Sequence, residues 1–385
     1  MEATKTSGGT RFYRPELDVV RFLAFLLVFI HHVLPPLYDP RITHLLKGFA
    51  PTFFILHDVF RYGLSLFFTL SAYLICELLI RERDTAGSVE VKQFYIRRIL
   101  RIWPLYYFGL ALGVAASFGP DGHASDVARI GWFAIFLGAW NTAFHGYVTN
   151  PVRPLWSISV EEQFYVFAPW VVKYFNRKAL YGFCAALLLL SNACLFYLGK
   201  ASASDPRIWT DSLVQFECFA AGILLCIVLQ HRLPAFAAWH RLLLVVGCCS
   251  CWLCASYLTL AHFSALDSTS SWQVMCAYAL IALGSAFIIA AFLGIHSKHV
   301  PAWAVYLGRI SFGLYVYHEF AIYVSATLLG HYVSFSSPIY YLKAVLAVGL
   351  TFFAAALSYR YIEPPFLKMK KRHSVDESQP LLNEH

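Results

Sequence analysis

The sequence predicts an all-α membrane protein, a polytopic bundle of about ten transmembrane helices that occupies residues 1–366. Hydrophobic residues make up 59% of the 385 residues, charged residues make up only 14%, and the mean hydropathy is +0.58. No soluble core needs so much apolar surface. Apolar runs of spanning length follow one another along the chain, which leaves no room for a large soluble domain.

Ten apolar runs define the expected helices. They cover residues 17–35, 59–80, 100–118, 155–172, 179–199, 212–230, 242–262, 273–295, 303–330 and 339–361. The first run lacks a small-residue cleavage site, so we expect an uncleaved anchor rather than a signal peptide. The apolar stretch 130–140 is too short to span, and a re-entrant or interfacial segment fits it best.

Basic residues cluster on alternate sides of these runs. With the N-terminus inside, most of the 30 lysines and arginines fall on the inner side, which is typical of a cytoplasmic face. Arg61 and Arg153 are among the exceptions. We therefore expect a multi-pass protein of the inner or plasma membrane with both termini in the cytoplasm. The net charge of +8 reflects this topology and attraction to lipid headgroups, and it gives no indication of a nucleic-acid partner.

The ends of the chain and the cysteines complete this outline. The basic and polar tail, 367–385, is expected to be cytoplasmic and disordered. All 10 cysteines lie within expected spans, which argues against structural disulfides. The cluster at 248–254 has no histidine or carboxylate nearby, so we expect apolar packing there and no metal site.

The first span contains two ionisable residues, Arg21 and His32. Such residues are costly at membrane depth and are functional candidates by default. Their spacing makes almost three helical turns, so both side chains project from one face, roughly 16 Å apart along the axis. For this span alone, a structural interpretation is equally good: Arg21 as an interfacial anchor and His32 as a hydrogen-bonded core residue.

The third span begins with Arg98 and Arg101, three residues apart on one helix face at the inner boundary. Two guanidiniums in this arrangement make a plausible phosphate clamp. The alternative is an ordinary positive-inside boundary followed by an aromatic belt.

The fourth span carries two adjacent glutamates into an apolar helix. Ser159, Glu162 and Tyr165 are spaced to share one face, whereas Glu161 points about 100° away. A buried glutamate needs a cationic partner or a bound proton. A structural salt bridge is therefore the alternative to a functional role.

The ninth span places His318 and Glu319 at mid-membrane depth or slightly beyond it. Glu217 in the sixth span is another intramembrane carboxylate. Glu363 precedes two prolines, which are expected to end the tenth span at the inner surface. His318 is the residue of this group that we expect to contribute to substrate binding.

Five blocks occur in order along the chain: RPELDVVRFLAFLLVFIHHV, SLFFTLSAYLI, FYIRRILRIWPLYY, LWSISVEEQFYVFAPW and GRISFGLYVYHEF. Together they closely resemble the blocks of the membrane-bound acyltransferase family 3, of the O-antigen acetyltransferase type. The resemblance extends over essentially the whole chain, from about residue 13 to residue 366. No SGNH hydrolase-like segment follows the spans, so the stand-alone form is expected.

The resemblance implies transfer of an acyl group, usually acetyl from cytoplasmic acetyl-CoA, to a hydroxyl of a cell-surface or secreted glycan or a small molecule. It implies acyl-CoA as the donor, no other cofactor and no metal. The family motif Arg-x10-His matches Arg21 and His32, and the motif Arg-x-x-Arg matches Arg98 and Arg101. The motif Ser-x-x-Glu-x-x-Tyr matches Ser159, Glu162 and Tyr165.

These residue types suit acyl transfer. A base must take the proton of the acceptor hydroxyl, and we assign this role to the imidazole of His32. Glu162 would orient His32 or stabilise its imidazolium, and the three motif arginines would hold donor phosphates or offset oxyanion charge. Direct attack and a covalent acyl-enzyme both stay open.

Two other classes of protein are alternatives to an enzyme. A transporter or flippase of lipid-linked saccharides would also bury arginines, glutamates and histidines, but this chain lacks paired half-sequence repeats and matching broken spans. A non-enzymatic scaffold would not require Arg21, Glu162 and His318 at membrane depth. The expected partners are acyl-CoA, a hydroxyl-bearing acceptor and membrane lipids, and no residue selects among acceptors.

Overall fold

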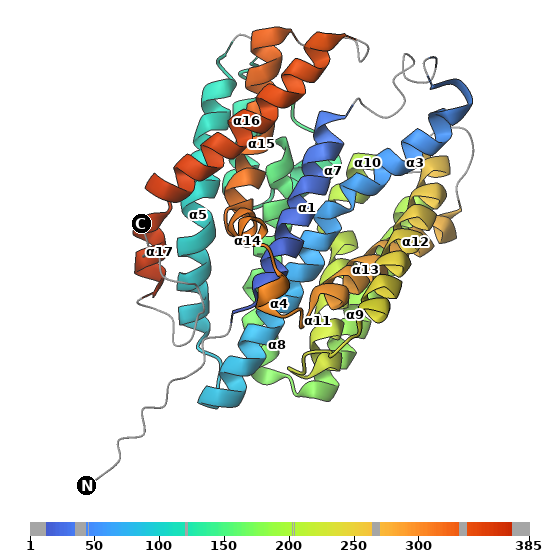
Figure 1. The fold of residues 1–385 in the computed structure, drawn as a ribbon, viewed down its shortest axis with the longest axis vertical. Helices are drawn as coiled ribbons and strands as arrows, with labels where there is room; N and C mark the ends of the chain where they lie inside the picture. The colour runs from blue at the N-terminus through green and yellow to red at the C-terminus, as the bar shows by residue number, and fades with distance from the viewer. Residues whose placement is uncertain are drawn as a thin grey trace.

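The computed structural model describes residues 13–34, 44, 46–119, 122–201, 203, 205–263, 270–330 and 337–371. Throughout these ranges the chain forms helices and connecting turns without any strand. The long helices lie side by side in one bundle, with α1 near its centre (Figure 1). The expected all-α membrane bundle is confirmed.

Ten long helices correspond to the ten expected spans. They are α1 (Pro15–Val33), α4 (Gly63–Ala86), α5 (Val91–Ala116), α8 (Trp156–Tyr174), α9 (Arg177–Lys200), α11 (Ser212–Leu229), α12 (Ala238–Phe263), α13 (Ser271–Phe292), α15 (Ser311–Leu329) and α16 (Pro338–Tyr361). The shorter helices are α3 (Ala50–Arg61), α6 (Asp126–Ala134), α7 (Gly138–His145), α10 (Asp205–Thr210), α14 (Ala302–Arg309) and α17 (Pro364–Lys371). Three 3-10 turns, η1 (Lys47–Phe49), η2 (Arg153–Leu155) and η3 (Ser297–His299), complete the described elements.

Seven segments of the described chain are long and apolar enough to cross a membrane. They are Lys47–Ala86, Val91–Ala116, Arg177–Lys200, Ser212–Leu229, Ala238–Thr259, Ser271–Phe292 and Pro338–Tyr361. The other long helices, α1, α8 and α15, carry several of the ionisable residues noted in the sequence, among them Arg21, Glu162 and His318. Polar residues are tolerated at such depth when they face the interior of a bundle, and all three of these helices contribute residues to the candidate site.

Several helices begin with a side chain that caps their free backbone N–H groups. Asn176, Asp211 and Ser337 accept hydrogen bonds at the starts of α9, α11 and α16. Ser270 and Gln273 form a reciprocal capping box at the start of α13. These short polar residues explain why the helix boundaries lie within a few residues of the ends of the apolar runs.

Small residues set how closely the central helices approach. A Cβ atom on Gly63 would lie 2.5 Å from the carbonyl oxygen of Ala24, and one on Gly222 would lie 2.2 Å from that of Thr69. Neither contact is sterically possible, so only glycine permits α4 to lie this close to α1 and to α11.

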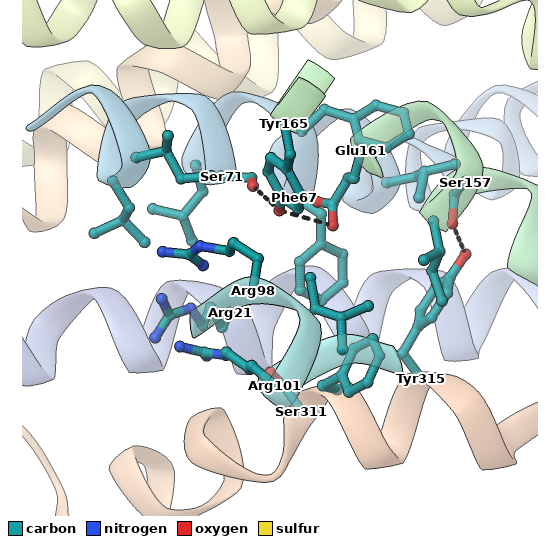
Figure 2. Close-up of a pocket in the computed structure, with 18 residues that line it drawn as sticks. Arg21, Phe67, Ser71, Arg98, Arg101, Ser157, Glu161, Tyr165, Ser311 and Tyr315 are labelled. Carbon is teal, nitrogen blue, oxygen red and sulfur yellow. Dashed lines mark hydrogen bonds between the residues drawn. The ribbon is translucent and has the colours of Figure 1, made fainter. Parts of the chain in front are cut away.

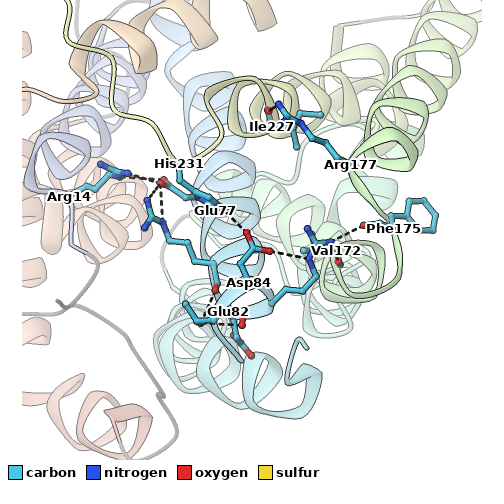
Figure 3. Close-up of polar contacts among 12 residues, drawn as sticks. Arg14, Glu77, Glu82, Asp84, Val172, Phe175, Arg177, Ile227 and His231 are labelled. Carbon is cyan, nitrogen blue, oxygen red and sulfur yellow. Dashed lines mark hydrogen bonds and ion pairs between the residues drawn. The ribbon is translucent and has the colours of Figure 1, made fainter. Parts of the chain in front are cut away.

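Buried ion pairs brace the end of the bundle at which α1 begins and α4 ends, which we call the basic end (Figure 3). Glu77 of α4 accepts from Arg14 at 2.6 Å and from Arg81 at 3.0 Å. Arg97 of α5 pairs with Glu82 at 3.0 Å. Basic residues that the sequence suggested as topology signals therefore also hold helices together.

Three expectations need a local correction. The ninth run is broken at Ile310, which separates α14 from α15. The stretch 130–140 is divided between α6 and α7, because Phe136 has a φ of 57° and stacks its ring on Tyr106. Residues 367–371 of the expected disordered tail belong to α17, and the rest of the tail lies outside the described residues.

Candidate active site

Among the described residues, two of the cavities within the bundle share part of their lining. The arginine cavity, of about 140 Å³, contains Arg21 in the first half of α1 and lies toward the basic end. The histidine cavity, of about 300 Å³, contains His32 in the last turn of α1 and lies toward the opposite end. Leu64 and Tyr315 line both. The Arg21 and His32 side chains therefore face different cavities from one side of the same helix.

Three arginines from two helices gather at one end of the arginine cavity: Arg21 of α1 with Arg98 and Arg101 of α5 (Figure 2). Asp18 forms an ion pair with Arg21. The Arg98 guanidinium lies 5.8 Å from the Tyr165 ring, and within the described chain no carboxylate forms a salt bridge with it. The cavity thus offers an excess of positive charge where an anionic group would enter.

A polar trio lies on the wall beyond the arginines (Figure 2). The Tyr165 hydroxyl donates to Glu161 at 3.2 Å and lies 2.7 Å from the hydroxyl oxygen of Ser71, which then donates to it. Phe67 and Ile102 contribute apolar surface beside this trio. The cavity therefore passes from a cationic end to a channel with both polar and apolar walls.

The structure separates the residues of the Ser-x-x-Glu-x-x-Tyr motif. Tyr165 lines the arginine cavity together with Glu161, because residues four apart lie nearly above one another on a helix. Glu162 instead accepts from the indole N–H of Trp103 at 3.1 Å. Ser159 is fully buried and lines neither cavity.

His32 lies beside the histidine cavity with its two ring nitrogens in different surroundings. Nδ1 is 2.9 Å from the carbonyl oxygen of Val28, which can only accept, so Nδ1 carries the proton. Nε2 of the neutral ring is then left with its lone pair. A histidine held in this tautomer can take a proton at Nε2.

A carboxylate and a second histidine from α15 surround His32. Oε1 of Glu319 lies 3.5 Å from Nε2 of His32 and accepts from Arg153 Nη2 at 2.6 Å. His318 is fully buried, its ring centroid is 5.0 Å from that of His32, and its Nδ1 donates to the carbonyl oxygen of Tyr315 at 2.6 Å. This places Glu319, rather than Glu162, beside the proposed base, which corrects the expected pairing.

The sequence held partial signals for these additional residues. Glu319 follows His318 in one of the recognised blocks, and Arg153 is a basic residue on the side expected to be poor in them. Their contact joins η2 to α15 and could not be inferred from spacing within one helix. Tyr315 and Ser157 also lie within recognised blocks, but no motif spacing distinguished them from their neighbours.

His32, His318 and Glu319 could also surround a metal ion. One ligand atom from each residue lies within 4.8 Å of the others. Two histidines and a glutamate form a known zinc set. However, Glu319 already accepts from Arg153 at 2.6 Å, and that positive charge opposes a cation at the same oxygen. The expectation of no metal therefore stays a prediction.

Aromatic rings line much of the remaining histidine cavity. Trp156, Trp209 and Tyr147 contribute apolar faces, and the Arg61 guanidinium lies 4.1 Å from the centre of the Trp209 ring. A concave, largely aromatic surface with a few polar groups is typical of a site for a small organic ligand.

Comparison with known proteins supplies independent information. A family profile described as an acyltransferase domain matches residues 14–360. The chain is 27% identical over 387 residues to a peptidoglycan O-acetyltransferase, OatA, of Listeria monocytogenes, covering 94% of this chain and 57% of the relative. It is 23% identical over 378 residues to the O-acetyltransferase OatA of Staphylococcus aureus, covering 92% of this chain and 57% of the relative.

Further relatives have the same extent of similarity. A protein of Staphylococcus aureus strain MSSA476 with a provisional O-acetyltransferase name is 26% identical over 395 residues, covering 94% of this chain and 59% of the relative. The chain thus spans less than two thirds of the length of these relatives. No solved structure matches it.

Proposed function

The chain belongs to the acyltransferase family 3, and on this premise we propose that it is an O-acetyltransferase that uses acetyl-CoA to acetylate a hydroxyl of a cell-surface glycan. One relative is named for peptidoglycan O-acetylation, which makes a glycan the first acceptor class to test. As a multi-pass membrane protein, the enzyme would take its donor from the cytoplasmic side and its acceptor from the other side.

The arginine cavity suits coenzyme A. Its phosphates would bind Arg21, Arg98 and Arg101, because guanidinium groups form strong, bidentate hydrogen bonds with phosphate. The pantetheine arm would follow the channel past Phe67 and Ile102, which would direct the thioester toward Tyr315. The charged end of the donor would thus stay at the basic end of the bundle.

His32 would act as the general base in the histidine cavity. The acceptor oxygen would attack the thioester carbon as its proton moves to Nε2 of His32. Glu319 would stabilise the resulting imidazolium, and Arg153 would hold Glu319 in place. The carbon–sulfur bond would then break, and the proton would pass from His32 to the coenzyme A sulfur. A two-step route through an acyl-enzyme would use the same groups.

One observation carries this proposal: Arg21 and His32 lie in adjoining cavities that share Tyr315 and Leu64. A donor held by arginines in one cavity could therefore reach a base that faces the other. Neither a transporter nor a scaffold would need a base in a cavity that shares its lining with the arginine cavity.

Oriented proteoliposomes test this function. Radiolabelled acetyl-CoA is added on the side of Arg98, and a soluble peptidoglycan oligosaccharide is placed on the side of His32. We expect labelled ester in the oligosaccharide and release of free thiol in equal amounts. Movement of unmodified saccharide across the membrane, without ester formation, would instead favour the transporter.

A further inference from the structure

Tyr315 is the polar side chain that lines both cavities. Figure 2 shows it with Ser157 at the end of the arginine cavity away from the guanidiniums. Its hydroxyl donates to the carbonyl oxygen of Pro154 at 2.8 Å and lies 2.6 Å from the hydroxyl oxygen of Ser157. Both side chains are buried, with Tyr315 only 6% exposed. The contact joins α15 to η2 and the start of α8.

The hydrogen bonds of this cluster are internally complete. The Ser157 hydroxyl also lies 3.0 Å from the Pro154 carbonyl oxygen. The two hydroxyl groups and this carbonyl oxygen are therefore all within hydrogen-bond distance of one another. When Tyr315 donates to the carbonyl, Ser157 donates either to the same carbonyl or to the Tyr315 hydroxyl. Neither hydroxyl then needs a water partner, and the phenol ring can remain between the cavities.

The same residue is linked to the proposed base. The backbone carbonyl of Tyr315 accepts from Nδ1 of His318, and the two rings lie 5.4 Å apart. The ring of His318 in turn lies 5.0 Å from that of His32. A shift of Tyr315 would therefore move His318, whose ring lies next to that of His32.

A base at this position creates a chemical problem. The histidine cavity is large enough to hold several water molecules, and an imidazole can deprotonate water as well as an alcohol. Hydrolysis breaks the same carbon–sulfur bond: water supplies the new oxygen, acetate and a proton leave, and the coenzyme A thiol is released. Water must be kept from the thioester by geometry until the acceptor is bound.

We propose that Tyr315, held by Ser157 and the Pro154 carbonyl, closes the passage between the two cavities and so directs the acetyl group to the acceptor instead of to water. This inference rests on the proposed acetyltransferase function. Acceptor binding in the histidine cavity would displace the phenol ring and expose the thioester to His32. Displacement of the ring breaks only two hydrogen bonds between neutral groups. The free energy of ligand binding readily offsets this cost.

The test measures coupling, which is acetylated product formed per thiol released. Full-length protein in proteoliposomes receives acetyl-CoA with and without the peptidoglycan oligosaccharide. We expect Tyr315→Ala to raise thiol release without acceptor several-fold and to lower coupling. Ser157→Ala, a smaller change that removes one contact to the phenol, should shift both quantities in the same direction.

Tyr317→Phe is the matched control. Tyr317 lies two residues further along α15, is also buried, and lines neither cavity. It should keep wild-type coupling. The proposal is overturned if inserted Tyr315→Ala and Ser157→Ala proteins couple like wild type, or if they lose thiol release and transfer in equal proportion. If Tyr315→Ala does not insert, Ser157→Ala alone decides. Failure of the proposed function is distinguishable, because the wild-type protein itself would then release no thiol.

Discussion

Nε2 of His32 lies 3.5 Å from Oε1 of Glu319, although the two residues belong to the first and ninth long helices of the chain. Glu319 also accepts from Arg153, so α1, η2 and α15 meet at one charged cluster. A carboxylate at this distance favours the protonated form of the imidazole during a reaction. The relationship identifies which carboxylate supports the proposed base, and it leads to the first prediction.

Replacing Glu319 by Gln should lower kcat by roughly a hundredfold, because the imidazolium loses its counter-charge while the hydrogen-bonding shape is kept. The KM for acetyl-CoA should change little, since Glu319 does not line the arginine cavity. Glu162→Gln is the control, because the Glu162 carboxylate contacts Trp103 and not His32. A larger loss of kcat in Glu162→Gln than in Glu319→Gln would restore Glu162 as the partner of the base.

Replacing Arg98 and Arg101 together by Ala should raise the KM for acetyl-CoA by about tenfold or more. The expected size follows from the loss of charge-assisted hydrogen bonds to phosphate. For dephospho-acetyl-CoA, the increase in KM caused by this double substitution should be smaller than for acetyl-CoA. This donor lacks one phosphate, so one contact with the arginines is already missing. Arg232→Ala removes an exposed arginine outside both cavities and should leave the KM unchanged. An equal increase in KM for both donors would mean that Arg98 and Arg101 do not bind this phosphate.

Removal of divalent metal should leave activity intact. His32, His318 and Glu319 are close enough to ligate an ion, but the Arg153 guanidinium lies on the glutamate oxygen that would bind it. Dialysis of purified protein against a strong chelator, followed by metal analysis and assay, checks this expectation. Loss of acetyl transfer that zinc restores would show that the cluster is a metal centre.

Glu363 should make stability depend on pH. Burial raises the pKa of Glu363 to about 7, and Arg101 and the Ser358 hydroxyl only partly oppose this shift. The folded state then binds the proton more tightly than the unfolded state, so stability is greatest below about pH 4.5 and declines as the pH rises toward 7. Glu363→Gln should therefore raise the Tm relative to wild type at pH 8 but not at pH 4.5. A Tm difference that is the same at both pH values would contradict the raised pKa.

The fold could be predicted from the sequence because a chain that crosses lipid must satisfy its backbone hydrogen bonds internally. A run such as 273–295 must be helical to satisfy its backbone hydrogen bonds, and it appears as α13 with a capping box that its own residues supply. The break at Ile310 was not predicted, although Gly308 and Arg309 directly precede it, because apolar residues on both sides make one run of spanning length.

The candidate site was predictable only in part. Motif spacing identified Arg21, His32, Arg98 and Arg101, and each of these lines a cavity. Contacts between helices decided the rest: Glu319 reaches His32 from α15, and Tyr315 meets Ser157 where α15 contacts η2 and the first turn of α8. Such contacts depend on helix rotation and register, which the pattern within one helix does not specify.

The most direct test of the account is the specific activity of His32→Ala, measured as acetylated oligosaccharide per unit of inserted protein. We predict a fall of about 10² to 10⁴ with membrane abundance near wild type, because the proton-transfer step is lost while the bundle remains folded. His31→Ala, one residue earlier and also facing the histidine cavity, should retain most of the activity. Near-normal specific activity in His32→Ala would contradict the assignment of the base.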